Sequence, residues 1–274
     1  MPLETIDFEF VSSLVLKRSA IVLEVEKKYL VESRLLPLAH KEGYSSISEL
    51  VGKLRVGSPN GLHEKVVEAM TTNETSFFRD VIPFDALKKV VLPETFQKRT
   101  TERRLNIWCG ASSTGQEPYT IALILREYFP NYSDWKIGIT ATDLSTEVLS
   151  RARAGRYSQL EVNRGLPAPL LVKYFQRLGT EWQLKEEVRR LVEFRQLNLI
   201  DAAWGILPAD IVFLRNVLIY FDVPTKKAIL KKVRQILRPD GYLFLGGAET
   251  TMNLDDAFER VPLERSGCYR LRKS

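Results

Sequence analysis

The first seventy residues place apolar side chains at the spacing of α-helices. Four of them stand at offsets 0, 3, 7 and 14 and are expected to share one helix face: Val22, Val25, Tyr29 and Leu36. Glycines at positions 43, 57 and 61 interrupt the pattern, and helices are expected to end near them. The pattern predicts a small all-helical domain over residues 1–72.

After a connecting segment, residues 73–94, short apolar runs alternate with helical stretches. This alternation is typical of a parallel sheet with helices on its faces. The expected strands are Leu105–Cys109, Ile137–Thr142, Ile211–Leu214 and Tyr242–Leu245. One helix is expected between the first two strands and another from Pro224 to Leu237. Aromatic residues mixed with charges predict a small antiparallel excursion over about 170–195, within a Rossmann-like α/β domain of residues 95–274.

Composition adds limits to this picture. The chain is 45% hydrophobic and 27% charged, which is ordinary for a globular protein. Two cysteines and two histidines are too few for a disulfide framework or a zinc cluster, so no metal is expected. No apolar run approaches the ~20 residues of a membrane helix, so we expect a cytoplasmic protein without membrane insertion.

The net charge of +6 is unevenly distributed. Residues 1–85 hold 10 Lys and Arg against 13 Asp and Glu, a net of −3, so residues 86–274 hold 30 against 21, a net of +9. A basic surface attracts nucleic acid, anionic membranes or acidic proteins. Charge alone does not choose among these partners.

The loop after the first expected strand has the glycine spacing of a phosphate-binding loop, at Gly110 and Gly115. The Lys and Ser or Thr that should follow are replaced by Gln116 and Glu117. A carboxylate would repel a triphosphate, whereas it suits a cofactor with an ammonium or sulfonium group. The alternative is that Glu117 only caps the following helix, where acids are favoured.

Asp143 stands at the tip of the second expected strand. A carboxylate at this place commonly accepts two hydrogen bonds from ribose hydroxyls. Its alternative role is to cap the helix from Thr146 onward. Together, the glycine-rich loop and the two acids favour a nucleoside without phosphates, and S-adenosylmethionine fits that description.

Five ordered motifs carry a family resemblance that spans the chain. They are TNETSFFRD from Thr72 to Asp80, IWCGASSTGQEPY from Ile107 to Tyr119, ATDLSTEVL from Ala141 to Leu149, LNL from Leu197 to Leu199 and FLRNVLIYFD from Phe213 to Asp222. The sequence resembles the CheR-type chemoreceptor glutamate O-methyltransferases of bacterial chemotaxis. The resemblance implies a class I S-adenosylmethionine-dependent methyltransferase domain with a small antiparallel β-subdomain, preceded by an all-α domain.

The resemblance also implies roles for individual residues. The implied cofactor-binding residues are Asn73, Thr75, Arg79, Gly110, Glu117, Asp143, Asn198, Leu199, Arg215 and Asn216. Glu117 would hold the methionine ammonium, Asp143 the ribose, and the pair Asn198 and Leu199 the adenine side. The implied catalytic residues are Arg79, Arg215 and Tyr220. The alternative for Tyr220 is that it is an aromatic residue of the core, and the alternative for the two arginines is that their side chains are solvated.

The implied reaction transfers a methyl group from S-adenosylmethionine to glutamate carboxylates in the cytoplasmic methylation helices of chemoreceptors, leaving S-adenosylhomocysteine. A nucleic-acid methyltransferase of the same fold would need Asn or Asp followed by Pro-Pro-Tyr, and here that place holds Arg215, Asn216, Val217 and Leu218, so no nucleic-acid partner is expected. A regulator that binds the cofactor without catalysis is a further alternative.

Two expectations concern recognition of the receptor. A basic stripe on the helical domain could face an acidic receptor helix, formed by Lys27, Lys28, Arg34, Lys53 and Arg55. Some relatives tether themselves to a C-terminal receptor pentapeptide through a glycine-rich hairpin. Here the corresponding stretch, Phe175 to Phe194, has one glycine, Gly179, and nearby acids, so no such tether is expected.

Overall fold

The computed structural model describes residues 3–57 and 61–272. By their contacts the residues group into two compact units. One unit comprises Met1–Thr72 with Tyr220–Thr225, and the other comprises Asn73–Ile219 with Lys226–Ser274. We describe each unit by itself.

The first unit is helical. Its elements are α1 (Thr5–Ser19), the 3-10 helix η1 (Val25–Lys27), α2 (Lys28–Lys41), α3 (Ile47–Val56) and α4 (Gly61–Ala69). Apolar side chains one helical turn apart form its core, such as Val11 and Val15 of α1 and Val31 and Leu35 of α2, which are fully buried. No described helix of either unit is both long and apolar enough to cross a membrane.

The predicted common face of Val22, Val25, Tyr29 and Leu36 is wrong. These side chains are 37%, 69%, 69% and 44% exposed. Residue Ala20 adopts a left-handed conformation that ends α1, and α2 begins only at Lys28. The first two of the four residues therefore precede the helix, and the face of α2 that is buried carries Val31, Leu35 and Ala39 instead.

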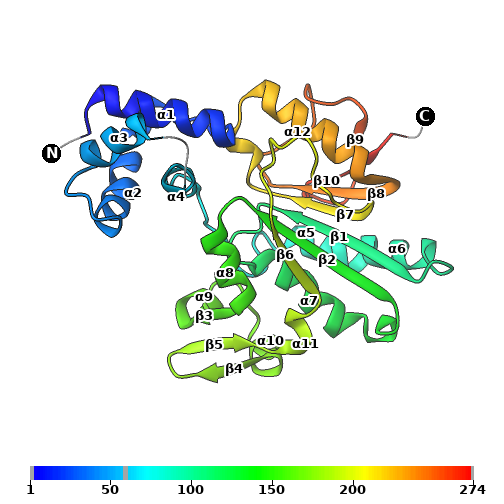
Figure 1. Ribbon diagram of the computed structural model, residues 1–274. Helices are drawn as coiled ribbons and strands as arrows, with labels where there is room; N and C mark the ends of the chain where they lie inside the picture. The colour runs from blue at the N-terminus through cyan, green and yellow to red at the C-terminus, as the bar shows by residue number, and fades with distance from the viewer. Residues whose placement is uncertain (1–2, 58–60, 273–274) are drawn as a thin grey trace. The chain divides into compact units, whose positions relative to one another are not determined.

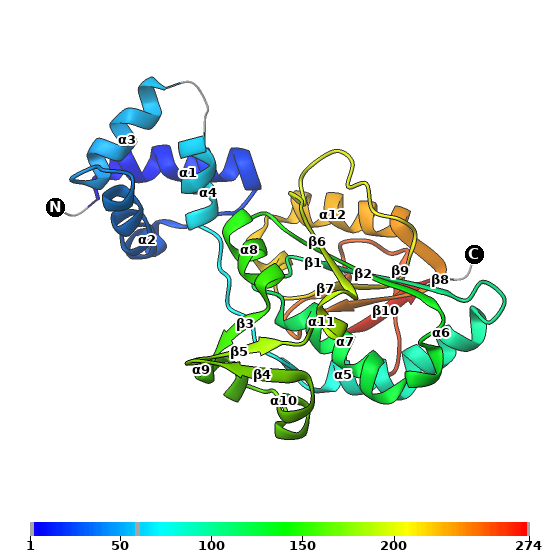
Figure 2. The ribbon, with the colours of Figure 1, turned by 60° about the horizontal axis from the view of Figure 1, so that its bottom comes forward.

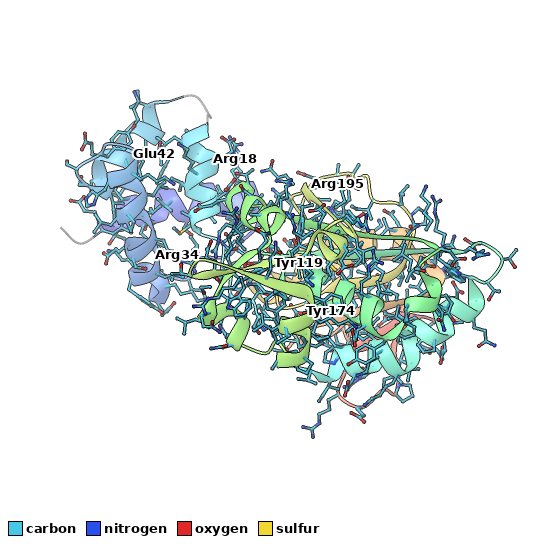
Figure 3. All side chains as sticks on the ribbon, turned by 90° about the horizontal axis from the view of Figure 1, so that it is seen from below. Arg18, Arg34, Glu42, Tyr119, Tyr174 and Arg195 are labelled. Carbon is cyan, nitrogen blue, oxygen red and sulfur yellow. The ribbon has the colours of Figure 1, made fainter. Side chains whose placement is uncertain are left out.

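Part of the predicted basic stripe makes internal contacts. Arg34, labelled in Figure 3, donates from Nη1 to the carbonyls of Met70 and Thr71 at 2.8 and 2.9 Å. The guanidinium of Arg55 pairs with the buried carboxylate of Asp7 at 2.9 Å. These two arginines therefore hold the helical unit together, which limits their use in a stripe.

The second unit is built on a seven-stranded sheet in the order β6-β2-β1-β7-β8-β10-β9. The strands are β1 (Arg104–Gly110), β2 (Lys136–Asp143), β6 (Val192–Gln196), β7 (Ala209–Leu214), β8 (Leu237–Leu245), β9 (Phe258–Arg260) and β10 (Cys268–Leu271). The first five in spatial order are parallel, and β10 runs antiparallel to both its neighbours. Each of the four predicted strands lies within one of these strands, so the Rossmann-like prediction is confirmed.

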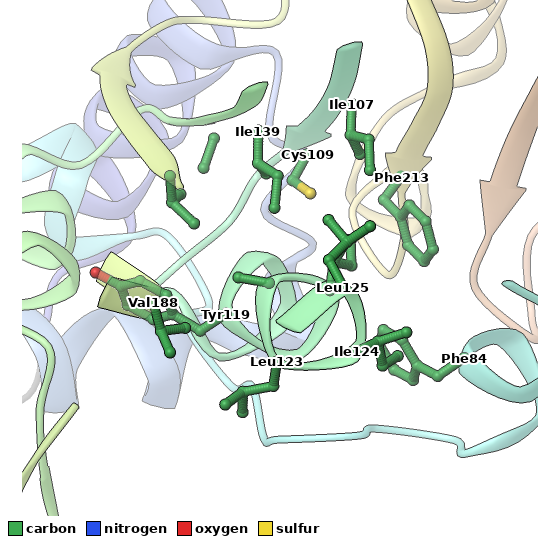
Figure 4. Close-up of a cluster of buried hydrophobic side chains, with 14 of the residues drawn as sticks. Phe84, Ile107, Cys109, Tyr119, Leu123, Ile124, Leu125, Ile139, Val188 and Phe213 are labelled. Carbon is green, nitrogen blue, oxygen red and sulfur yellow. The ribbon is translucent and has the colours of Figure 1, made fainter. Parts of the chain in front are cut away.

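Helices cover both faces of this sheet. The helices after residue 72 are α5 (Ile82–Ala86), the π-helix η2 (Leu87–Val91), α6 (Leu92–Lys98), α7 (Gln116–Tyr128), η3 (Pro130–Tyr132), α8 (Thr146–Ala154), α9 (Gln159–Asn163), α10 (Ala168–Tyr174), α11 (Glu186–Arg189), η4 (Leu218–Tyr220) and α12 (Val223–Ile236). Of these, α9 and α10 pack against a separate small sheet. Figures 1 and 2 show α7 and α12 on opposite faces. In Figure 4, Ile107, Cys109 and Ile139 project from the strands toward α7, whose Leu125 is buried, while Ile124 of the same helix lies beside Phe84. This packing holds α7 against the sheet.

A separate three-stranded antiparallel sheet has the order β3-β5-β4 (Figure 1). Its strands are β3 (Arg156–Ser158), β4 (Phe175–Leu178) and β5 (Glu181–Leu184). The predicted antiparallel excursion is confirmed, but its first strand comes from before residue 170. Strand β6, at the end of the predicted range, pairs in parallel with β2 and belongs to the large sheet.

Candidate functional site

The loop between β1 and α7 turns tightly at the carboxyl edge of the sheet. A Cβ on Gly110 would lie 2.8 Å from Cδ1 of Leu214, so a larger residue would push into β7. Ala111 and Ser113 have φ of 55° and 50°, and Gly115, just before α7, has φ of 92°. Left-handed conformations at non-glycine residues are costly and concentrate at functional sites. The loop therefore has the geometry of a ligand-binding turn.

Asp143 joins three loops at this edge. Its Oδ2 accepts a hydrogen bond from the backbone N–H of Ser113 at 2.8 Å, and its Oδ1 accepts from Ser145 N–H at 3.0 Å. Its carbonyl accepts from Leu197 N–H at 2.9 Å, beyond β6. The N-cap of α8 is Ser145, whose hydroxyl accepts from Val148 N–H, so the alternative of a capping Asp143 is wrong.

Glu117 lies in the first turn of α7 and faces Arg215. Arg215 is buried and donates from Nη1 to Oε2 of Glu117 at 2.7 Å. From Nη2 it donates to Oδ2 of Asp80 at 2.8 Å and to the Arg79 carbonyl at 3.1 Å. Burial raises the pKa of the Glu117 carboxyl above its ordinary value, although the positive charge of Arg215 opposes that shift. One guanidinium therefore serves two carboxylates.

A cavity of about 260 Å³ opens beside this cluster. It is lined by Arg79, Asp80, Ile82, Pro83, Arg215, Asn216, Leu245, Gly247, Ala248, Arg265 and Ser266, and we call it the arginine pocket. Three guanidinium groups against one carboxylate make its lining positive. The pocket contains two predicted catalytic residues, Arg79 and Arg215, together with the predicted cofactor residue Asn216.

The predicted residues of the connecting segment lie in the same unit. The carbonyl of Asn73 accepts a hydrogen bond from the hydroxyl of Ser113 in the glycine-rich loop at 2.8 Å. Thr75 is half-buried, and the fully buried ring of Phe77 anchors the segment against Tyr157 at 5.0 Å between centroids. The segment therefore runs from the glycine-rich loop to Arg79 at the arginine pocket.

Asn198 and Leu199, the predicted adenine-side pair, lie in the loop that follows β6, and their role in binding stays a prediction. Leu199 is buried, and its carbonyl accepts from Trp204 Nε1 at 3.3 Å and from Lys232 Nζ at 2.9 Å. The ring of Trp204 packs against the buried Trp108 of β1 with centroids 4.8 Å apart. These contacts form an apolar wall near the end of β1.

Tyr220 belongs to the helical unit, where its carbonyl accepts from the Val22 N–H at 3.0 Å. Its predicted catalytic role stays a prediction. Cys109 is fully buried, and burial raises the pKa of its thiol well above the ordinary value, as expected of an inert core residue.

Sequence reasoning missed Glu249, which holds the loop that follows β7. Its carboxylate accepts four backbone N–H groups, from Gly246, Asn216, Val217 and Leu218, at 2.7 to 2.8 Å. It also missed Asp80, Arg265 and Ser266. Asp80 lies inside one of the sequence motifs. Glu249 lies in the loop after β8, and Arg265 and Ser266 lie in the loop after β9, where no spacing rule identifies a functional residue.

Comparison with known proteins identifies the family. The family model described as "CheR methyltransferase, SAM binding domain" matches residues 73–266, and that of "CheR methyltransferase, all-alpha domain" matches residues 6–71. The chain belongs to the CheR methyltransferase family. It is 44% identical to chemotaxis protein methyltransferase 1 of Pseudomonas aeruginosa over 268 residues, covering 96% of this chain and 97% of that one.

Two further chemotaxis methyltransferases are similar to this chain over most of their length. The chain is 43% identical to chemotaxis protein methyltransferase Cher2 of Pseudomonas putida, covering 93% of this chain and 94% of that one. It is 40% identical to the chemotaxis protein methyltransferase of Vibrio parahaemolyticus, covering 92% of each. The protein is thus a methyltransferase of chemotaxis that uses S-adenosylmethionine, and its acid-lined glycine-rich loop fits a cationic cofactor.

Proposed function

We propose that this protein transfers the methyl group of S-adenosylmethionine to glutamate side chains in the cytoplasmic methylation helices of chemoreceptors. The observation that supports this substrate is the arginine pocket, because the guanidinium groups of Arg79 and Arg265 line it in addition to Arg215, which is already paired with carboxylates, and guanidinium groups attract a carboxylate. It lies beside Glu117, which is proposed to hold the cofactor. The reaction would take place in the cytoplasm, without membrane insertion or nucleic acid.

The cofactor is proposed to lie along the carboxyl edge of the sheet. Glu117 would bind its ammonium, Asp143 its ribose hydroxyls, and Asn198 with Leu199 its adenine side. Asn73, Thr75 and Gly110 would line the same path. Bound there, S-adenosylmethionine supplies an electrophilic methyl group on a sulfonium.

The chain's own residues contribute alignment more than proton transfer. A glutamate carboxylate has an ordinary pKa of ~4.3, so it is ionised at pH 7 and needs no general base. Holding two reactants in line can supply roughly 7 to 11 kcal/mol of a barrier. Arg79, at the pocket, is proposed to orient the carboxylate, and Tyr220 is proposed to hydrogen-bond it.

The test uses the bond that is made. A methyl ester is hydrolysed by mild alkali to volatile methanol, so a receptor cytoplasmic fragment labelled from radioactive S-adenosylmethionine should release its label as methanol. The label should map to glutamates of the methylation helices. An alkali-stable label, or label on added nucleic acid, would contradict the proposal.

A further inference from the structure

Two residues that line the arginine pocket each have a buried side-chain donor that has no partner among the described residues. Among the described residues, the Nε of Arg215 and the hydroxyl of Ser266 are buried without a hydrogen bond, and both residues line the pocket. Buried polar atoms in folded proteins are nearly always paired. An arginine N–H can only donate. A ligand that completes this pocket therefore has to bring acceptor oxygens.

Arg215 is poorly suited to bind a further carboxylate as its main partner. Both of its Nη atoms already donate to carboxylates, at 2.7 Å to Glu117 and at 2.8 Å to Asp80. Two negative charges therefore compensate its single positive charge. A strong, buried ion pair would also lower the reactivity of a carboxylate that has to act as a nucleophile.

Arg265 has the opposite character. It lines the same pocket but is exposed, and within the described part of the chain its guanidinium has no recorded hydrogen bond or ion pair. An ion pair with an exposed arginine is screened by water, so it attracts a carboxylate without holding it tightly. Arg265 can therefore attract the substrate carboxylate and still leave that carboxylate reactive as a nucleophile.

The backbone fixes Arg265 and Ser266 at this place. The next residue, Gly267, has φ of +65°, and a Cβ there would lie 2.4 Å from the Leu245 carbonyl oxygen. Its own carbonyl accepts from the Leu245 N–H at 2.9 Å, at the end of β8. The turn before β10 is therefore pinned against the strand end that also lines the pocket.

We propose that Arg265 and Ser266 receive the carboxylate that becomes methylated, while Arg215 organises Glu117 and Asp80. This inference rests on the proposed function and names the residues that select its substrate. It assigns to the loop between β9 and β10 the recognition of the acceptor glutamate.

The kinetic test compares R265Q with R260Q in the full-length protein. Arg260 is exposed on β9 of the same hairpin and does not line the pocket, so the two variants lose equal charge. We expect R265Q to raise the KM for a receptor cytoplasmic fragment about ten-fold, with R265K intermediate and R260Q near wild type. S-adenosylhomocysteine affinity, measured by calorimetry, should stay within about two-fold in all of them.

Ser266 gives an independent check. Its hydroxyl makes no internal hydrogen bond, so S266A should keep the melting temperature of the wild type and lower kcat/KM several-fold. Equal kinetics for R265Q and R260Q, or unchanged kcat/KM in S266A, would overturn the inference.

A binding measurement separates this inference from the proposed function. N-acetylglutamate is titrated into the protein saturated with S-adenosylhomocysteine, and the side-chain N–H signals of the arginines are followed by NMR. The signal of Arg265 should shift, and R265Q should lose the binding. Shifts confined to Arg79 and Arg215 would overturn the inference, whereas failure of the wild type to methylate receptors would contradict only the proposed function.

Discussion

Glu117 is a carboxylate whose ionisation the site has to maintain. Burial raises its pKa above the ordinary value, and the positive charge of Arg215 is the main opposing influence. The proposed contact with the cofactor's ammonium group would favour the ionised form, so protons and cofactor would compete for this side chain. Cofactor affinity is then complete above the raised pKa and falls as the pH drops through it.

We therefore predict that S-adenosylhomocysteine binding weakens as the pH falls through the raised pKa of Glu117, and that this loss begins at a higher pH than an ordinary glutamate would give. E117Q should bind more weakly and lose most of this pH dependence, because its amide does not titrate. Calorimetry at each pH measures both proteins. An equally steep pH dependence in E117Q would assign the titration to another group.

Asp143 combines two tasks in one side chain. It accepts N–H groups from Ser113 and Ser145, and it is proposed to accept two ribose hydroxyls. D143A should cost about 2 to 4 kcal/mol of S-adenosylhomocysteine binding, from charge-assisted hydrogen bonds of about 1.5 to 3 kcal/mol each less reorganisation. D143N keeps one acceptor oxygen and serves as the matched variant. Near-native affinity in D143A would mean that Asp143 only joins the loops.

At the scale of elements, the sequence predicted the strands that have a regular apolar pattern, and it missed the elements whose position depends on tertiary contacts. Buried parallel strands are continuous apolar runs, so the cores of β1, β2, β7 and β8 could be located. The periodic set from Val22 to Leu36 misled because α2 begins only at Lys28, so that Val22 and Val25 precede the helix that carries Tyr29 and Leu36. Strand β3 has three residues and no pattern of its own.

The same limit applies to the site. Glu117 and Asp143 follow strands and could be found by position, whereas Glu249 is recognisable only from the four N–H groups that surround it. No local sequence pattern identifies a carboxylate that accepts hydrogen bonds from a loop more than thirty residues away along the chain.

Glu249 yields a stability prediction for the loops after β7 and β8. E249Q replaces one carboxylate oxygen by an NH₂ group that would face backbone donors, so we expect a loss of about 2 to 4 kcal/mol of unfolding free energy. Urea unfolding measures it. E264Q changes an exposed glutamate of the loop between β9 and β10 and should stay within about 0.5 kcal/mol. Similar losses in both variants would contradict the role of Glu249.

The hairpin of β4 and β5 bears on receptor recognition. Strand β4 is an edge strand, and Gly179 with φ of 62° makes the tight turn to β5. The turn has one glycine, and the acids Glu181, Glu186 and Glu187 stand nearby in sequence. We predict that a C-terminal receptor pentapeptide titrated into the protein gives no heat. Micromolar binding would show that the edge of β4 accepts a strand despite these charges.

At the scale of the whole molecule, the chain consists of two units with separate cores. The predicted cofactor residues, from Asn73 to Asn216, belong to the unit that holds the large sheet. A ligand that binds one folded unit stabilises that unit by mass action, by about 2.7 kcal/mol at a hundred times its Kd. Proteins of several domains need not unfold in one step.

Scanning calorimetry of the full-length protein should therefore resolve a ligand-dependent transition and a ligand-independent one. S-adenosylhomocysteine should move the first to higher temperature as its concentration rises, and it should leave the transition of the helical unit in place. R265Q should show the same shift as the wild type, because Arg265 is assigned to the acceptor and not to the cofactor. A single transition that moves as a whole would mean that the two units unfold cooperatively, and that cofactor binding stabilises the helical unit as well.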